Sequence, residues 1–172
     1  TYYLKENGLS IDDLNVSAMK VPSMNDALKT KQIDGIITFQ PYVSIAANDS
    51  SNQVLADSKV ILPNHPCCVV VASDDFIKNH EDTVKDILAI HKNATDFINE
   101  NVQNGSADAV VKLLPKDIVS DAGLEAKSLE SFPFISGIDN SFKADVDAFQ
   151  KLEVEIGILN KTVDHKDLYW EA

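Results

Sequence analysis

The sequence predicts an α/β protein with a largely parallel sheet, on three observations. Helical and strand-like segments alternate over the first sixty residues, as expected when each strand is followed by a crossover helix. Several short runs alternate apolar and polar side chains or are rich in β-branched residues, a pattern typical of strands. Further along, residues 81–101 repeat apolar side chains at helical spacing, which indicates one long amphipathic helix.

Glycine and proline positions divide the chain into these elements. Gly8 fits the end of a helix, and Pro41 fits the first turn of one. Strands are predicted at residues 14–19, 33–39, 53–56 and 67–72, with a further extended edge segment at 132–135. Helices are predicted at residues 1–7, from 22 onwards, at 41–47, 81–101, 107–114 and 142–156, with weaker helical turns at 116–122, 124–129 and 164–170.

Composition and charge exclude several classes of protein. The 172 residues suffice for one ordinary domain or two small lobes, and 44% are hydrophobic, enough to bury a core. With 15 basic and 27 acidic residues the net charge is 15 − 27 = −12, which argues against nucleic acid or anionic membrane as a partner. All the basic residues are lysines, so an anion site within this stretch has no guanidinium group.

The two cysteines, Cys67 and Cys68, are adjacent and cannot close a stabilising loop. On a strand, neighbouring side chains point to opposite faces, so we expect one thiol in the core and the other on a different surface. A metal site formed with His65 is the alternative, but further ligands at a recognisable spacing are missing. We therefore predict neither a metal nor a cofactor.

Signatures of catalysis are largely absent from the sequence. It contains no G-x-S-x-G elbow, no phosphate-binding glycine loop and no His-Glu-x-x-His pair. The paired acids Asp12-Asp13 and Asp74-Asp75 fall at element boundaries, where carboxylates cap helices and meet solvent. We therefore expect a protein that is not an enzyme.

The order of several short motifs carries a resemblance to a known family. Asp34-Gly35, Phe39, Gln40 and Pro41-Tyr42 follow the pattern "DA-x-x-x-W-(D/E)-P-(Y)", with Gln40 in place of the acid. Three further passages match in the same order: residues 75–80, 95–101 and 163–168. The chain resembles the periplasmic-type solute-binding proteins of ABC importers, specifically the nitrate, sulfonate and taurine group.

The resemblance implies a two-lobe architecture of periplasmic-binding-protein type II, with the N-terminal part of lobe one missing. Residues 1–62 would form most of lobe two, 63–66 the crossing between lobes, and 67–172 the return segments of lobe one. We expect such a chain to expose sheet edges, through which a second copy or an exchanged segment pairs.

The resemblance also implies a function. The protein would bind a small, anionic solute between its lobes, outside the cytoplasm, and deliver it to an ABC permease. Gln40 in place of the acid removes a partner for a cationic group, which disfavours an aminosulfonate. The alternatives are core packing for the two aromatic residues and a helix-capping or surface role for Gln40. The residues expected to contact the ligand are Phe39, Gln40, Tyr42, His65, Cys67 and Cys68.

Two other functions stay open on the sequence. The thiamine-pyrimidine synthases resemble these binding proteins and carry a cysteine-rich, iron-binding patch with a reactive histidine. The run His65-Pro66-Cys67-Cys68 resembles that patch faintly, although it has only two cysteines. A ligand-sensing domain of a regulator or receptor is the third possibility, because it would leave this sequence unchanged.

Overall fold

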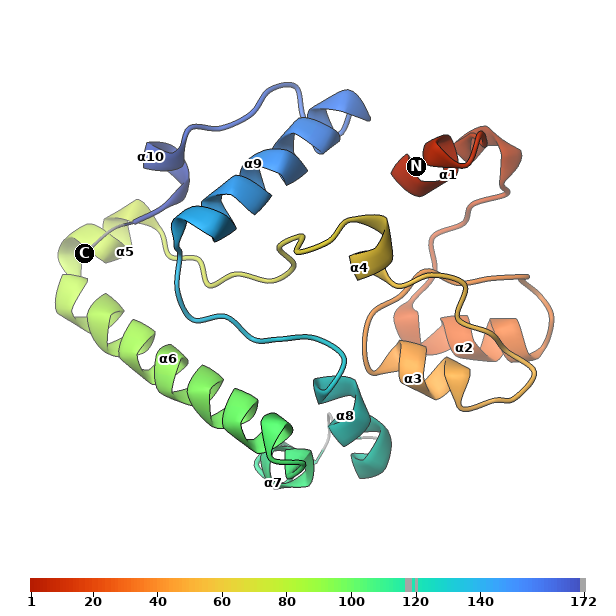
Figure 1. Cartoon of the computed structure of the whole chain (residues 1–172), viewed down its shortest axis with the longest axis horizontal. Coiled ribbons are helices and arrows are strands. Elements are labelled where there is room, and N and C mark those ends of the chain that lie inside the picture. The colour runs from red at the N-terminus through yellow and green to blue at the C-terminus, as the bar shows by residue number, and fades with distance from the viewer. Residues whose placement is uncertain (117–118, 120, 171–172) are drawn as a thin grey trace. The chain divides into compact units, whose positions relative to one another are not determined.

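The computed structural model describes residues 1–116, 119 and 121–170, which form helices joined by extended segments (Figure 1). None of the described helices is long and apolar enough to cross a membrane. The elements are α1 (Tyr2–Glu6), the 3₁₀ helix η1 (Ile11–Asp13), α2 (Val21–Lys29), α3 (Tyr42–Ala47), α4 (Ser58–Ile61), α5 (Asp74–Asn79), α6 (Glu81–Gln103), α7 (Ala107–Val111), α8 (Ala122–Leu129), α9 (Asn140–Glu155) and α10 (His165–Leu168).

Local capping explains where several helices begin. The side-chain oxygens of Ser73, Asp121 and Asp139 each accept a hydrogen bond from a backbone N–H in the first turn of α5, α8 and α9, respectively. Such bonds satisfy donors that have no partner within the helix. These starts therefore depend on residues immediately next to each helix, which a sequence pattern can reveal.

The helix predictions are largely confirmed. The segment predicted at 81–101 is α6 (Glu81–Gln103), and the last amphipathic helix predicted at 142–156 is α9. Gly105, just beyond α6, has φ +70°, a conformation that favours glycine at a helix end. The helical turn predicted at 116–122 includes residues 117, 118 and 120, which lie outside the described residues.

The prediction of an α/β fold with a parallel sheet is wrong. Within the described ranges the structure contains helices and no β-strand. Most of the residues predicted at 14–19, 33–39, 53–56 and 67–72 have extended or irregular backbone instead, without strand partners. This finding also shows that two expectations from the resemblance are wrong: the two-lobe architecture built on sheets, and the exposed sheet edges.

A physical difference between helices and strands accounts for the error. A helix satisfies its backbone groups within the segment, whereas an extended segment becomes a strand only beside a second one. The β-rich runs here lie exposed: Ile37 is 96% exposed, Leu55 88% and Val71 82%. The composition of these runs predicts extended backbone but does not provide a partner.

The chain divides into two compact units, each built from separated segments. The first comprises residues 1–16, 56–88 and 137–172, and the second comprises residues 17–55 and 89–136. Helix α6 crosses from one unit to the other, so its first turns belong to the first unit and its last turns to the second. The predicted division into residues 1–62, 63–66 and 67–172 is not tested by these units and stays a prediction.

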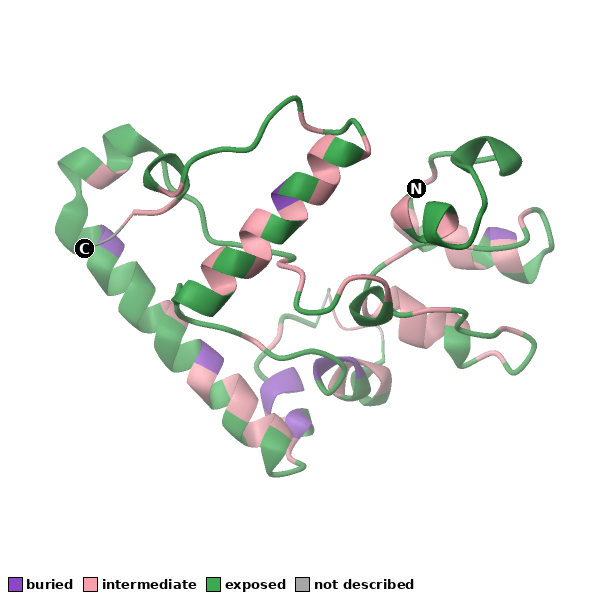
Figure 2. Cartoon of the chain, turned by 45° about the horizontal axis from the view of Figure 1, so that its top comes forward, coloured by how far each residue is buried: buried purple, intermediate pink, exposed green. Residues whose placement is uncertain are grey.

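The clearest core of the second unit lies between α7 and α8. Val110, Val111 and Leu129 are 5%, 5% and 8% exposed, and they pack together. Figure 2 shows such buried residues as separate bands on the helices, with most extended connections exposed. Partly buried side chains surround this cluster: Ile98, Val102, Val119, Ala126 and Phe134.

Polar contacts tie the C-terminal segments of the first unit together. On α9, buried Gln150 accepts a hydrogen bond from the backbone N–H of Val163 at 2.7 Å and donates to the carbonyl of the same residue at 3.4 Å. Lys5 forms an exposed ion pair with Glu155 at 2.6 Å. Gln150 therefore fixes the segment leading to α10, since it satisfies both backbone groups of one residue.

Candidate functional site

Among the predicted site residues, Gln40 accepts several side-chain hydrogen-bond contacts at its amide oxygen. Its Oε1 accepts hydrogen bonds from the Ser44 backbone N–H at 3.1 Å and from the Ser44 hydroxyl at 2.8 Å. The Ser128 hydroxyl, on α8, lies 3.3 Å away. Ser128 is only 2% exposed, and its hydroxyl also lies 2.8 Å from the Leu124 carbonyl, the shorter of the two donor contacts. We call Gln40, Ser44 and Ser128 the Gln40 cluster.

The orientation of the Gln40 amide follows from one of these contacts. A backbone N–H can only donate, so the atom facing the Ser44 N–H must be the amide oxygen. The Nε2 group, with two N–H donors, then points away from these contacts, and no acceptor among the described residues bonds to it. Gln40 precedes Pro41, the N-cap residue of α3, and its side-chain oxygen accepts from a backbone N–H in the first turn of that helix.

Two buried polar atoms accompany the Gln40 cluster. Thr38 Oγ1 is buried and has no hydrogen-bond partner within the described part of the chain. Asn25, on α2, donates from Nδ2 to the Tyr42 carbonyl at 3.2 Å, and its Oδ1 is likewise buried without a partner there. A buried polar atom without a partner carries a free-energy cost and calls for an explanation such as a bound molecule.

The two predicted aromatic residues flank the same short segment. The rings of Phe39 and Tyr42 meet edge to face, with their centroids 5.7 Å apart and their planes at 89°. Phe39 is 62% exposed, whereas Tyr42 is half-buried. The core-packing alternative therefore fails for Phe39, since most of this ring meets solvent. The Gln40–Pro41 peptide bond between the two rings is cis.

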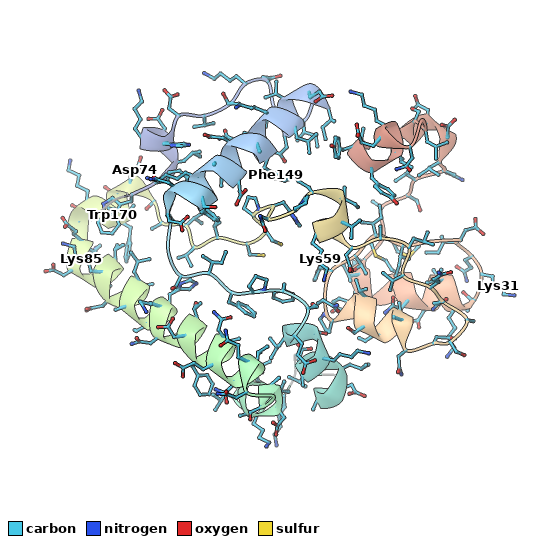
Figure 3. All side chains as sticks on the ribbon, viewed as in Figure 1. Lys31, Lys59, Asp74, Lys85, Phe149 and Trp170 are labelled. Carbon is cyan, nitrogen blue, oxygen red and sulfur yellow. The ribbon has the colours of Figure 1, made fainter. Side chains whose placement is uncertain are left out.

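The predicted residues His65, Cys67 and Cys68 belong to the first unit, and the Gln40 cluster belongs to the second. His65 Nδ1 lies 3.0 Å from the Leu62 carbonyl, so that nitrogen carries the proton of this hydrogen bond. Its ring lies 6.3 Å, centroid to centroid, from that of Phe149, which is labelled on α9 in Figure 3. His65 is therefore held within its own unit.

The expected burial of one cysteine is wrong. Both cysteines are exposed, and their sulfurs lie 3.7 Å apart rather than on opposite faces of a strand. The hydrogen bond between the two sulfurs, followed by partial burial, raises the pKa of the Cys67 thiol. Over the described ranges no three His, Cys, Asp or Glu side chains gather in a way that could hold a metal ion.

Sequence reasoning missed Ser44, Ser128, Thr38 and Asn25. Ser44 lies four residues after Gln40 on a predicted helix, so its position was a usable signal. Ser128 lies 88 residues beyond Gln40, and no local pattern links the two. Thr38 and Asn25 are ordinary polar residues in sequence, and only their burial distinguishes them.

Two open hollows on the described surface are lined by other residues than the predicted ones. One, of about 320 Å³, lies along α2 and is lined by Met19, Ser23, Asp26, Ala27, Thr30 and Gln32. The other, of about 310 Å³, lies in the first unit beside the ion pair of His165 with Asp147, whose atoms are 2.8 Å apart. Neither hollow includes Gln40, so we base the candidate site on polar geometry instead of cavity size.

The chain belongs to the NMT1-like family, which matches it over residues 1–115. This match confirms the resemblance to solute-binding proteins of the nitrate, sulfonate and taurine group. The matched range includes Gln40, Ser44 and both cysteines, and it ends before α8.

Relatives in three Brucella species carry the name "Putative binding protein". They come from Brucella abortus (strain 2308), Brucella suis biovar 1 (strain 1330) and Brucella melitensis biotype 1 (strain 16M). Each is 26% identical to this chain over 174 residues, covering 96% of this chain and 53% of the relative. The chain thus spans about half the length of the curated relatives it matches. No solved structure matches it.

Proposed function

We propose that this protein is a non-enzymatic binding protein for a small oxyanion such as nitrate or a sulfonate. The observation that carries the proposal is the Gln40 amide, whose oxygen is held by Ser44 while its two N–H donors have no acceptor among the described residues. Membership of the NMT1-like family and the names of the relatives support a binding role.

The donors available near Gln40 suit the oxygens of such a solute. Gln40 Nε2 offers two N–H groups as hydrogen-bond donors. The exposed face of Phe39 offers an apolar surface for the carbon part of an alkylsulfonate. Because these donors are neutral, they bind through short hydrogen bonds and not through a net positive charge.

The net charge of the chain leads to a prediction about how binding depends on salt. A net charge of −12 repels anions at long range, and salt screens that repulsion. When the added salt does not itself compete for the site, binding through the neutral amide donors should therefore not weaken between low and physiological ionic strength. Attraction by surface lysines would instead weaken as salt is added.

The neutral Gln40 also bears on the choice among sulfonates. A ligand amine needs an acidic partner, and the family pattern has an acid where this chain has Gln40. We therefore expect methanesulfonate to bind at least as tightly as taurine, which adds an amine. The Gln40→Glu variant should reverse that order, because the new carboxylate attracts the amine and repels the sulfonate.

Isothermal titration calorimetry of the purified chain with nitrate, methanesulfonate and taurine tests the proposal. We expect saturable binding of an oxyanion, which Gln40→Leu abolishes because it removes both N–H donors. The matched control is Gln103→Leu, since Gln103 is exposed in the same unit and binding should be unchanged. Equal affinity of the wild type and Gln40→Leu would refute the assignment of Gln40.

We further propose that the solute is delivered to an ABC permease and that the protein works outside the cytoplasm. The family match supports both statements, which rest on it and not on a contact in the structure. Uptake of a radiolabelled oxyanion by cells with and without the gene tests them. Equal uptake by the two strains, over a range of solute concentrations, would contradict delivery.

A further inference from the structure

Cys67 and Cys68 form a pair of accessible thiols whose sulfurs face each other. The Sγ atoms lie 3.7 Å apart, and both residues are exposed. Adjacent residues of a regular strand would direct their side chains to opposite faces. The backbone after Pro66 therefore departs from strand geometry in a way that brings both sulfurs to one side.

The separation of the two sulfurs suits a shared third atom better than a direct bond. A disulfide requires the sulfurs to approach to about 2.05 Å, and adjacent residues reach that only with strain. An atom bonded to both sulfurs, with bonds of about 2.3 Å, lets them stay well beyond disulfide length. From 3.7 Å, the two sulfurs therefore need a smaller approach to share one atom than to form a disulfide.

The surroundings decide which kind of atom the pair can hold. A structural zinc ion needs four ligands, and the described residues provide no group of three suitable side chains. Trivalent arsenic forms only three bonds and brings one substituent with it, so two sulfurs complete its coordination. We propose that Cys67 and Cys68 form a vicinal dithiol site for trivalent arsenicals of the organoarsenoxide class.

The reaction balances without an oxidant or reductant. Two arsenic–sulfur bonds form, the arsenic–oxygen bond breaks, and the two thiol protons leave with that oxygen as one water molecule. Arsenic stays trivalent throughout. A divalent metal ion would require thiolates, which the raised pKa of Cys67 disfavours near neutral pH, whereas an arsenoxide accepts the protons itself.

Intact-protein mass spectrometry of the reduced chain with one equivalent of phenylarsine oxide tests the site. We expect one phenylarsenic group per chain, released by a dithiol such as dimercaptopropanol and retained in 2-mercaptoethanol. Cys67→Ser and Cys68→Ser should each weaken binding about 100-fold, since the second bond is then no longer intramolecular. Failure of the wild type to retain the group, or equal retention by either single variant, would overturn the proposal.

A comparison of folded and unfolded chain separates the geometry from the mere presence of neighbouring cysteines. Far-UV circular dichroism verifies that both serine variants fold, as expected for exposed positions. The affinity of the wild type for phenylarsine oxide should fall when the chain is unfolded in urea, because the sulfurs are no longer held together. The same affinity in the folded and unfolded chain would refute the contribution of the folded backbone.

Discussion

Valines in two regions of this molecule have opposite environments. Val110 and Val111 on α7 are each 5% exposed and pack against Leu129 of α8. Residues 69–71 are also three valines, yet they are 64%, 55% and 82% exposed in an extended segment. The difference lies in the backbone: α7 forms hydrogen bonds within itself and offers one face to a nearby helix, whereas the extended run has no strand beside it among the described residues.

The largest expected effect tests the buried side of this comparison. Leu129→Ala removes a side chain that is 8% exposed, and should lower the free energy of unfolding by about 2 to 5 kcal/mol. Val71→Ala, at 82% exposure, should change it by less than about 0.5 kcal/mol. Urea denaturation followed by circular dichroism measures both. Similar losses for the two variants would show that the extended valines are buried in solution.

A polar contact should give the next largest effect. Gln150→Leu leaves the N–H and carbonyl of Val163 without their partners and should lower the free energy of unfolding by about 1 to 3 kcal/mol. Urea denaturation again provides the measurement. Gln103→Leu is the control, because Gln103 is exposed and should tolerate the same change within about 0.5 kcal/mol. If Gln150→Leu has the same free energy of unfolding as the wild type, this contact contributes nothing to stability.

Removal of one buried hydroxyl should stabilise the protein. The Tyr169 hydroxyl is buried without a hydrogen-bond partner within the described residues. Tyr169→Phe should therefore raise the free energy of unfolding by about 1 kcal/mol. Thermal denaturation compares it with Tyr3→Phe, where Tyr3 is 42% exposed and little change is expected. A loss of stability in Tyr169→Phe would reveal that the hydroxyl has a partner in solution.

The smallest expected effect is a pH dependence of the free energy of unfolding that comes from the Tyr169 hydroxyl. Burial, and secondarily the charge of Asp147, raises the pKa of Tyr169 in the folded protein, while Lys143 opposes this shift. As the pH rises past about 10, the unfolded chain loses its tyrosine proton first, so stability should decline. In Tyr169→Phe this part of the decline should be absent. Identical alkaline profiles for the two proteins would contradict a raised pKa.

Sequence patterns predicted the helices because their signals are local. The apolar repeat of α6 and the capping residue Asp139 of α9 lie within or beside the helices they specify. The predicted sheet failed because β-branched runs such as residues 69–71 favour extended backbone without specifying a partner. Local pattern is therefore a good guide to the helices here and a poor guide to sheet formation.

The candidate site was also predictable only where its signals are local. Gln40 stood out through its place in a family motif, and its ligand-binding role stays a prediction. Its support by Ser128, 88 residues later, depends on how α3 and α8 pack, which no local pattern contains. The proximity of the two cysteine sulfurs was equally hidden, because it depends on backbone angles after Pro66.

The side-chain amide of Gln40 can be observed directly by ¹H–¹⁵N correlation NMR, with its resonance assigned by its loss in Gln40→Leu. Titration with nitrate or methanesulfonate should shift this NH₂ pair saturably and leave the pair of exposed Gln103 in place. If both pairs move together with salt concentration, or if the Gln40 pair does not move at all, the proposed oxyanion contact at Gln40 is wrong.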